Sequence, residues 1–198
     1  MESRLNMSEN PPQPKSSGET HLEVAAVRSE STEQPSVVEL TPDKWEEYKT
    51  LRLRSRETNP EAWRSSIHTE PEMDESYWRE YLEDQNTKMF AVEVAGTAVA
   101  MAGLQKQADG SFRLKRVYTA PEMRGKGFGK MLLEKVLQEA EGLGAKSIRL
   151  GVTGDTEEQR AAMGLYTSLG FTETYTEDDT MGDGRIHKNI EMEKKFDE

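Results

Sequence analysis

A glycine-rich hexapeptide at residues 124–129, Arg-Gly-Lys-Gly-Phe-Gly, limits most strongly what this chain can fold into. It follows a predicted strand over residues 112–119 and opens a predicted helix over residues 130–143. Closely spaced glycines at a helix start let backbone N–H groups face outward, because no Cβ stands in the way. Those amides and the helix dipole together form an anion site that suits phosphate best. The sequence therefore predicts a strand–loop–helix unit that holds a phosphorylated small molecule.

Two other phosphate-binding motifs fit this loop less well. The chain contains no Gly-x-x-x-x-Gly-Lys-Ser/Thr segment. A dinucleotide-binding Gly-x-Gly-x-x-Gly motif belongs early in a βαβ unit, with an acidic residue about 20 positions later. Both of these site types are therefore disfavoured.

Composition and charge exclude several classes of protein. The 198 residues suit one domain with extensions, and the absence of cysteine removes disulfides and thiolate metal sites. The net charge is −11, from 26 basic and 37 acidic residues. Such a surface repels nucleic acid, so we expect no nucleic-acid partner. No apolar run approaches the roughly 18 residues of a membrane span, so we expect no membrane partner.

The first 36 residues differ in composition from the rest. They contain no Phe, Tyr or Trp, and they hold seven serines and half of the prolines. Such a segment cannot bury enough apolar surface to offset its ordering entropy, which predicts a disordered tail over residues 1–36 and a folded domain over residues 37–198. A regulatory or partner-binding tail is the alternative. The chain start lacks a basic segment followed by an apolar one, so we expect a soluble, cytoplasmic protein.

Strand and helix signals follow one another through the rest of the chain. A short strand at residues 36–40 precedes three helices that begin near Pro42, Pro60 and Ser76. In the predicted strand over residues 112–119, every second residue from Phe112 to Tyr118 is expected on one side. The remaining expected elements are strands at 88–94 and 97–104, a strand at 147–152, a helix at 156–169, and strands at 171–175 and 186–194.

Residues 114–133 resemble the acetyl-CoA-binding motif of the GNAT N-acetyltransferase superfamily. The family pattern Gln/Arg-x-x-Gly-x-Gly/Ala is met by Arg124, Gly127 and Gly129. Residues 162–171, Ala-Met-Gly-Leu-Tyr-Thr-Ser-Leu-Gly-Phe, are similar to a second family motif. The resemblance covers residues 37–194 and implies an α/β (α+β) GNAT fold. That fold is a mixed, mostly antiparallel central sheet of about six to seven strands, flanked by about four to five helices.

The resemblance also implies acetyl-CoA as co-substrate, without a metal. The strand over residues 112–119 should splay from the strand over 147–152, with the pantetheine arm of CoA in the gap. Main-chain amides from Met123 through Lys130 would hold the pyrophosphate. The backbone groups expected to bind the arm are those of Val117, Tyr118 and Thr119. The loop residues expected to bind the cofactor are Arg124, Gly125, Lys126, Gly127, Phe128, Gly129 and Lys130.

Positive charge is concentrated around this loop although the chain is acidic. Within residues 113–130, six basic residues face a single acid, Glu122. The six are Arg113, Lys115, Arg116, Arg124, Lys126 and Lys130. A solvated basic face is the alternative for such a run, but the adjoining glycine loop favours a role in binding CoA.

Tyr166 in the second motif is the expected general acid, because the family often carries a tyrosine there that protonates the CoA sulfur. A packing role in the core is the alternative. Gln159 stands where the family often has Asn. It is expected either to contact the cofactor arm or to complete a capping box with Thr156.

Glu93, on a strand near the expected cleft, is the candidate general base, and a water chain to a backbone carbonyl is the alternative. Arg52 and Ser66 are candidates for contact with the acceptor, with surface or packing roles as the alternative. The three histidines, His21, His68 and His187, are too dispersed for a metal site or a catalytic triad.

Together these features predict an enzyme. It would move the acetyl group of acetyl-CoA to a primary amine of a small molecule by direct attack in a ternary complex. Two alternatives remain open: an acetyltransferase for protein N-termini or lysines, and a non-catalytic regulatory module that binds acyl-CoA.

Overall fold

The computed structural model describes residues 34–64, 70–153 and 156–196. The predicted tail over residues 1–36 thus lies outside the described residues except for its last three. The strands are β1 (Ser36–Glu39), β2 (Thr87–Val94), β3 (Thr97–Lys106), β4 (Phe112–Thr119), β5 (Ser147–Thr153), β6 (Thr172–Thr180) and β7 (Ile186–Lys195). The α-helices are α1 (Trp45–Thr58), α2 (Glu75–Glu83), α3 (Phe128–Gly142) and α4 (Glu157–Ser168). Single 3-10 turns occur at η1 (Pro42–Lys44), η2 (Pro60–Ala62), η3 (Glu70–Glu72) and η4 (Pro121–Met123).

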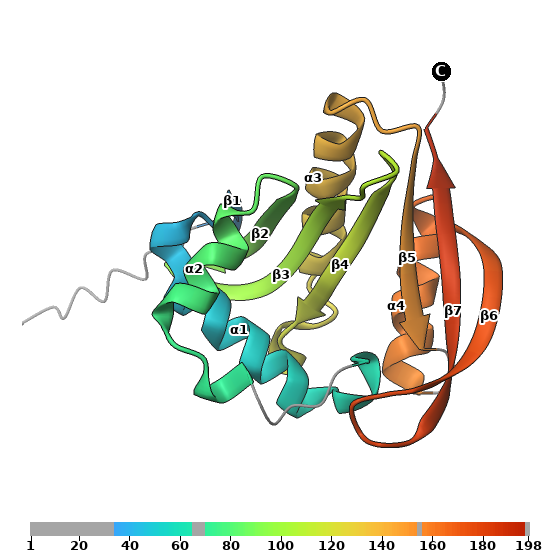
Figure 1. Ribbon diagram of the computed structural model, residues 1–198, viewed down its shortest axis with the longest axis horizontal. Coiled ribbons are helices and arrows are strands. Elements are labelled where there is room, and N and C mark those ends of the chain that lie inside the picture. The colour runs from blue at the N-terminus through green and yellow to red at the C-terminus, as the bar shows by residue number, and fades with distance from the viewer. Residues whose placement is uncertain (1–33, 65–69, 154–155, 197–198) are drawn as a thin grey trace, which may run out of the picture. The chain divides into compact units, whose positions relative to one another are not determined.

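All seven strands join one sheet in the order β1-β2-β3-β4-β5-β7-β6 (Figure 1). Neighbouring strands are antiparallel except β4 and β5, which run parallel. The glycine loop and α3 follow β4 and provide the crossover to β5, as parallel pairing requires. The predicted mixed, mostly antiparallel sheet with flanking helices is confirmed.

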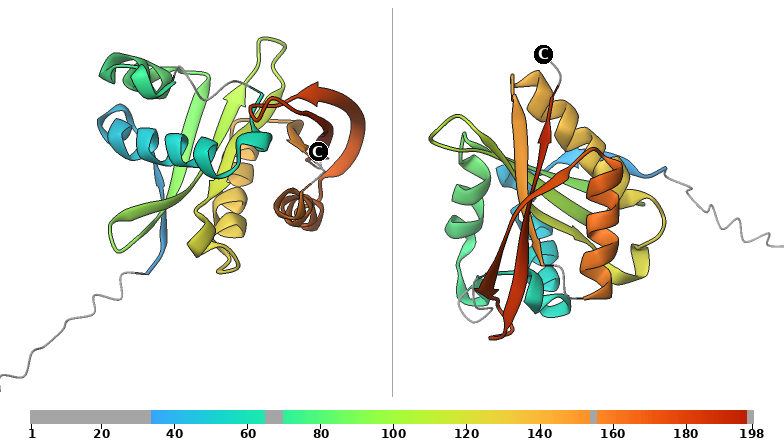
Figure 2. Two further views of the ribbon diagram at one scale, coloured as in Figure 1. Left: turned by 90° about the horizontal axis from the view of Figure 1, so that it is seen from below. Right: turned by 90° about the vertical axis from the view of Figure 1, so that its right-hand side faces the viewer.

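Helices cover both faces of the sheet, as the two views of Figure 2 show. On one face, α3 and α4 enclose a core that includes Leu133, Val136 and Phe171. On the other face, α1 and α2 enclose a second core around Tyr48 and Trp78. In α3 the buried residues recur at helical spacing, which is the pattern expected of a helix packed on a sheet.

β4 contains a β-bulge that changes which residues face each helix layer. Next to Tyr118, two residues of β4 oppose Ala102 of β3 alone. Arg116, the first residue of the bulge, has a φ of 56°, in the left-handed region. Leu114 therefore faces the α3–α4 core, whereas Tyr118 is buried in the α1–α2 core. The predicted placement of alternate residues from Phe112 to Tyr118 on one side is wrong beyond Leu114, because the bulge reverses the phase.

Most other predicted elements lie close to the observed ones. Pro60, expected to begin a second helix, opens only the 3-10 turn η2. The strand predicted over residues 171–175 continues to Thr180 in β6. Within the described ranges, no helix is both long enough and apolar enough to cross a membrane.

Candidate active site

The sheet opens between its two parallel strands. β4 pairs with β5 only at Phe112–Ile148 and Arg113–Arg149, and the strands then diverge (Figure 1). Beyond Arg113, the facing edges of both strands carry N–H and C=O groups that the other strand does not bind. Such an edge can pair with an extended ligand as it would with an added strand. The splay implied by the family resemblance is present.

A cavity of about 720 Å³ lies at this opening. It brings together four of the predicted site residues, Arg52, Val117, Gln159 and Tyr166. The residues that line it are Arg52, Ala62, Trp63, Arg64, Arg113, Leu114, Lys115, Arg116, Val117, Leu150, Gly151, Val152, Thr153, Gln159, Tyr166, Tyr175, Glu177, Met181, Asn189 and Glu191.

The loop between β4 and α3 has a backbone conformation that favours glycine. Gly125 and Gly127 have φ values of 74° and 85°, which are strained for residues with a Cβ. Gly127 is the N-cap of α3 and provides no side-chain cap. The amides of residues 125–130 make no hydrogen bond to another residue of the described part. They are therefore available to an anion at the positive end of the helix dipole.

The first residues of the predicted cofactor loop have a different role. The amides of Met123 and Arg124 donate to the carbonyl oxygens of Ala120 and Pro121, so the available amides begin at Gly125. The Arg124 guanidinium donates to the Thr119 carbonyl (3.2 Å) and to Asn59 Oδ1 (2.8 Å). Arg124 thus ties the loop to the end of β4 and to the start of η2.

Gly129 lies where the loop meets the second motif. A Cβ at this position would lie 3.4 Å from Leu165 Cδ2 and 3.6 Å from Thr119 Oγ1, which are ordinary contact distances. The first turn of α3 therefore lies beside Leu165, the neighbour of Tyr166, and beside the end of β4.

The six basic residues near the loop do not form one patch. Arg113 pairs with Glu191 (2.7 Å), and Lys115 donates to Gln105 Oε1 (2.5 Å). Arg116 faces the α1–α2 layer, where its guanidinium stacks on an aromatic ring. Only Arg124, Lys126 and Lys130 belong to the loop itself. The predicted basic cluster is therefore divided between the two faces of the sheet.

Tyr166 lies on α4 where the cavity meets the α3–α4 core. Its side chain is only 6% exposed and packs edge-on against Phe171, with ring centroids 5.9 Å apart. Burial raises the pKa of the Tyr166 phenol well above its usual range. The phenol is therefore neutral and can donate a proton. Its position is compatible with both predicted roles, packing and acid catalysis.

Gln159 lies where either of its two predicted roles could be served. Its backbone N–H donates to Thr156 Oγ1 (3.2 Å), which is the predicted helix cap. Its buried side chain lines the cavity. Position alone therefore leaves both predicted roles open.

Two buried polar residues of the cavity were not predicted. Thr153 at the end of β5 pairs across the sheet with Asn189 of β7, and both line the cavity. The Oγ1 atom of Thr153 has no hydrogen-bond partner among the described residues. A single Thr and a single Asn in two separate strands form no sequence motif that would predict a site, because only the cross-strand register brings them together.

Glu93 is not part of this site. It lies on β2, is absent from the cavity lining, and pairs with Lys44 of η1. The Glu93 carboxylate raises the pKa of Lys44. The side chain of Tyr118 is likewise buried in the α1–α2 core, where its hydroxyl contacts Thr58 Oγ1 at 3.3 Å.

A buried ion cluster flanks the cavity on the α1 side. The Glu70 carboxylate accepts hydrogen bonds from Arg52 (3.0 and 3.2 Å) and from Arg56 (2.7 Å). Arg52 is 4% exposed and also stacks on Trp63, 4.3 Å from the ring centroid. Ser66, predicted together with Arg52, lies outside the described residues.

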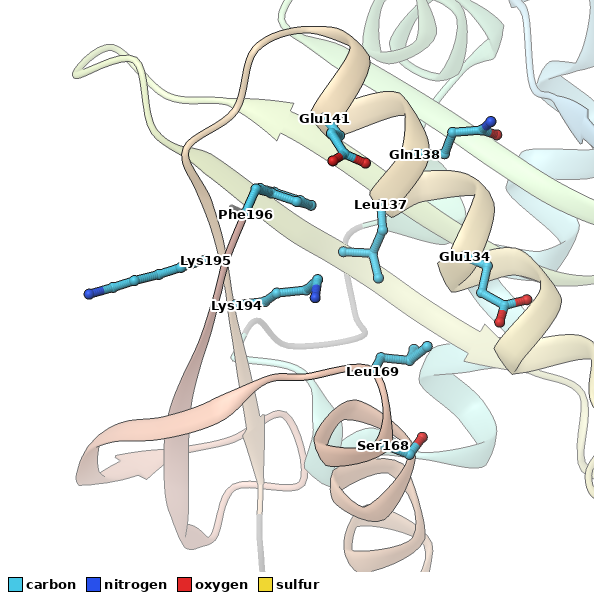
Figure 3. A pocket seen from close by; sticks show the side chains of 9 residues that line it. All are labelled: Glu134, Leu137, Gln138, Glu141, Ser168, Leu169, Lys194, Lys195 and Phe196. Carbon is cyan, nitrogen blue, oxygen red and sulfur yellow. The ribbon is translucent and has the colours of Figure 1, made fainter. Parts of the chain in front are cut away.

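A second hollow of about 460 Å³ lies at the far end of α3, against the end of β7 (Figure 3). Leu137, Leu169 and Phe196 line it together with charged side chains, and none of the predicted site residues does. In the described part of the chain, no group of three or more His, Cys, Asp or Glu side chains could hold a metal ion.

Comparison with known proteins connects this geometry to a family. The model of the acetyltransferase (GNAT) family matches residues 43–171. That match covers the glycine loop, the β4–β5 opening and Tyr166. A search of curated proteins gives no match.

Solved structures share the fold at low sequence identity. A ribosomal-protein-alanine N-acetyltransferase from Brucella melitensis is 21% identical with a TM-score of 0.69, over 81% of this chain and 99% of that one. YncA, a putative acetyltransferase from Salmonella typhimurium with its cofactor acetyl-CoA, is 20% identical with a TM-score of 0.71, over 83% and 95%. PaiA N-acetyltransferase from Thermoplasma acidophilum, in complex with coenzyme A, is 20% identical with a TM-score of 0.62, over 82% and 99%.

Proposed function

Since this chain belongs to the GNAT acetyltransferase family, we propose that it transfers the acetyl group of acetyl-CoA to a primary amine of a small molecule. One observation carries the proposal. A helix start with available amides adjoins an unpaired strand edge, and that edge leads to a cavity lined by Tyr166. Together these three features suit a long, diphosphate-bearing thioester whose reactive end lies inside the cavity.

Acetyl-CoA would follow the loop and then the opening. The amides of residues 125–130 and the α3 dipole would bind its diphosphate, with Lys126 and Lys130 adding positive charge. The unpaired edge of β4 at residues 117–119 would hydrogen-bond the pantetheine arm. Gln159 would contact the same arm from α4.

The reaction forms a C–N bond and breaks a C–S bond. The amine nitrogen attacks the thioester carbonyl carbon, CoA leaves as a thiol after gaining a proton, and the nitrogen loses a proton to solvent. An alkyl ammonium has a pKa of about 10.4, so deprotonating it at pH 7 costs about 4.6 kcal/mol. Holding the amine against the thioester is worth about 7–11 kcal/mol, which can offset that cost.

Tyr166 would supply the proton that the departing sulfur needs. Because burial raises its pKa, the phenol keeps its proton until the thiolate forms beside it. General acid catalysis of this kind contributes about 10²–10⁴-fold to the rate. The amine proton would leave to solvent through water held by a backbone carbonyl, because the Glu93 carboxylate is already bound by Lys44.

A small amine suits this cavity better than a segment of a folded protein. The β6–β7 hairpin meets the end of η2, where Gly182 N donates to the Trp63 carbonyl. Arg64 also pairs with Glu177 and Asp179 of β6 (2.8 and 2.7 Å). These contacts join two segments that line the cavity, which favours a small acceptor over a protein segment.

Thiol release from acetyl-CoA, measured over a panel of small amines and peptides with free N-termini, tests the proposal. Mass spectrometry of the products identifies the acceptor. Acetylated small amines are the expected result. Acetylation of peptides alone would support the protein acetyltransferase, and acetyl-CoA binding without thiol release for any acceptor would support the non-catalytic module.

A further inference from the structure

The cavity is basic inside an acidic protein. Of the seven charged side chains that line it, five are basic and two, Glu177 and Glu191, are acidic. Each of the two acids already pairs with an arginine of the lining. Arg52 and Arg64 also pair with Glu70 and Asp179, so Lys115 and Arg116 are the lining cations without a carboxylate partner in the described part of the chain.

Arg116 is the least compensated of these cations. Its guanidinium lies 3.7 Å from the centre of the Tyr81 ring and 5.6 Å from that of Tyr48. Within residues 34–64, 70–153 and 156–196, no carboxylate pairs with it. Burial lowers the pKa of Arg116 to about 10, so the group stays charged at pH 7. The side chain is half-buried, and an anion beside it would stabilise a cation that otherwise contacts only aromatic faces.

The backbone conformation of Arg116 also marks this residue as part of a functional site. Its φ of 56° places a residue with a long side chain in the left-handed region, at the bulge of β4. Such strain costs about 1–3 kcal/mol and is concentrated at functional sites. The bulge turns this guanidinium toward α1 and α2, and Arg116 also lines the cavity.

Arg52 adds a second incompletely bound guanidinium to the same wall. Two of its nitrogens donate to Glu70, but Nη1 is buried and has no hydrogen-bond partner in the described part of the chain. Glu70 is shared between Arg52 and Arg56. Burial raises the pKa of Tyr81, the ring on which Arg116 stacks, to about 12, and the Arg52 charge partly opposes this shift.

These two cations are poorly placed for the diphosphate of CoA. The available amides lie at the start of α3, on one face of the sheet. Arg116 stacks on side chains of α1 and α2, which cover the opposite face. An anion bound at Arg116 would therefore be part of the acceptor rather than of CoA.

We infer that the acceptor is an amine bearing an acidic group, a carboxylate or a phosphoryl group, which Arg116 and Nη1 of Arg52 bind on the α1–α2 side of the cavity. This inference rests on the proposed function. The amine would then lie on the far side of the acceptor from its acidic group, toward the thioester.

Matched acceptor pairs test the inference on the unmodified protein. Phenylalanine is compared with phenylalaninamide, β-alanine with β-alaninamide, and 2-aminoethyl phosphate with ethanolamine, by kcat/KM for thiol release. We expect the acidic member of at least one pair to be favoured about 10- to 100-fold, as charged hydrogen bonds allow. The first two pairs report a carboxylate and the third a phosphoryl group. Equal rates, or a preference for the neutral member in all three pairs, would overturn the inference while leaving amine acetylation standing.

Two variants locate the effect. Arg116→Gln should abolish the preference for the acidic acceptor, mainly by raising its KM, and Arg116→Lys should restore part of that preference. Calorimetry should give an unchanged affinity for acetyl-CoA in both variants. Lys49→Gln is the matched control, because Lys49 also lies over aromatic rings of this core but does not line the cavity. A preference that survives Arg116→Gln would contradict the assignment. If no amine reacts at all, the proposed function fails; calorimetry of the CoA-bound protein with N-acetyl-β-alanine and its amide then decides the anion site alone.

Discussion

Tyr166 lies at the boundary between the α3–α4 core and the cavity, and a single substitution separates its two roles. Tyr166→Phe removes the proton donor but keeps the ring that packs on Phe171. We expect thiol release at saturating acetyl-CoA to fall about 10-fold or more, while acetyl-CoA affinity and thermal stability stay close to those of the unmodified protein. Tyr175→Phe is the control, because Tyr175 lines the cavity but is 61% exposed. An unchanged rate for Tyr166→Phe would leave it only a packing role.

Glu70 joins two buried arginines, and its loss should be severe. Glu70→Gln leaves Arg52 and Arg56 without their shared carboxylate. Removing one partner of a buried ion pair costs about 3–5 kcal/mol, which urea unfolding would measure. Glu122→Gln is the matched control, since its pair with Arg54 is exposed on both sides and such pairs contribute about 0–1 kcal/mol. Equal effects of the two substitutions would show that the cluster does not stabilise α1.

At the level of elements, α3 has glycines at both ends that should respond in opposite ways. Gly127→Ala forces a left-handed φ of 85° on a residue with a Cβ, at a cost of about 1–2 kcal/mol, and should weaken acetyl-CoA binding. Gly142→Ala lies in the helix with open space around it and should stabilise the protein by about 0.5–1 kcal/mol. Thermal unfolding and calorimetry measure both effects. A Gly127→Ala variant that binds acetyl-CoA with unchanged affinity would argue against a role of the glycine loop in binding it.

The sequence was sufficient to predict most elements, because hydrophobic spacing and turn residues mark them directly. It could not reveal the bulge in β4. Strand alternation assumes one conformation throughout, and the left-handed residue there is an arginine rather than the glycine or asparagine that would signal it. The bulge moves Arg116 and Tyr118 to the α1–α2 face, so Arg116 lies on the opposite face from Leu114.

Only those parts of the site that lie in continuous sequence motifs could be predicted. The glycine loop and Tyr166 belong to continuous motifs, whereas the Thr153–Asn189 pair depends on the register between β5 and β7. Glu93 was chosen for its residue type and its strand. Its pairing with Lys44 arises from the packing of η1, which a strand pattern does not describe.

At the scale of the whole molecule, the described fold begins with β1. The backbone of β1 pairs with β2 from Ser36 to Glu39, and Leu40 is 2% exposed. A variant that starts at residue 34 should therefore keep its unfolding midpoint and its acetyl-CoA affinity. A variant that starts at residue 41 loses this edge strand and a buried leucine, so it should unfold at a lower temperature. Loss of stability in the first variant would show that residues 1–33 contribute to the fold.

The central claim is that main-chain amides at the start of α3 bind the diphosphate of an acyl carrier. Calorimetric titration of the protein with acetyl-CoA and with S-acetylpantetheine, which lacks the diphosphate, tests it most directly. Two or more charge-assisted hydrogen bonds contribute about 1.5–3 kcal/mol each. They predict saturable binding of acetyl-CoA that is at least about 100-fold tighter than the binding of S-acetylpantetheine. Equal affinity for the two compounds, or no saturable binding of acetyl-CoA at millimolar concentration, would contradict the account.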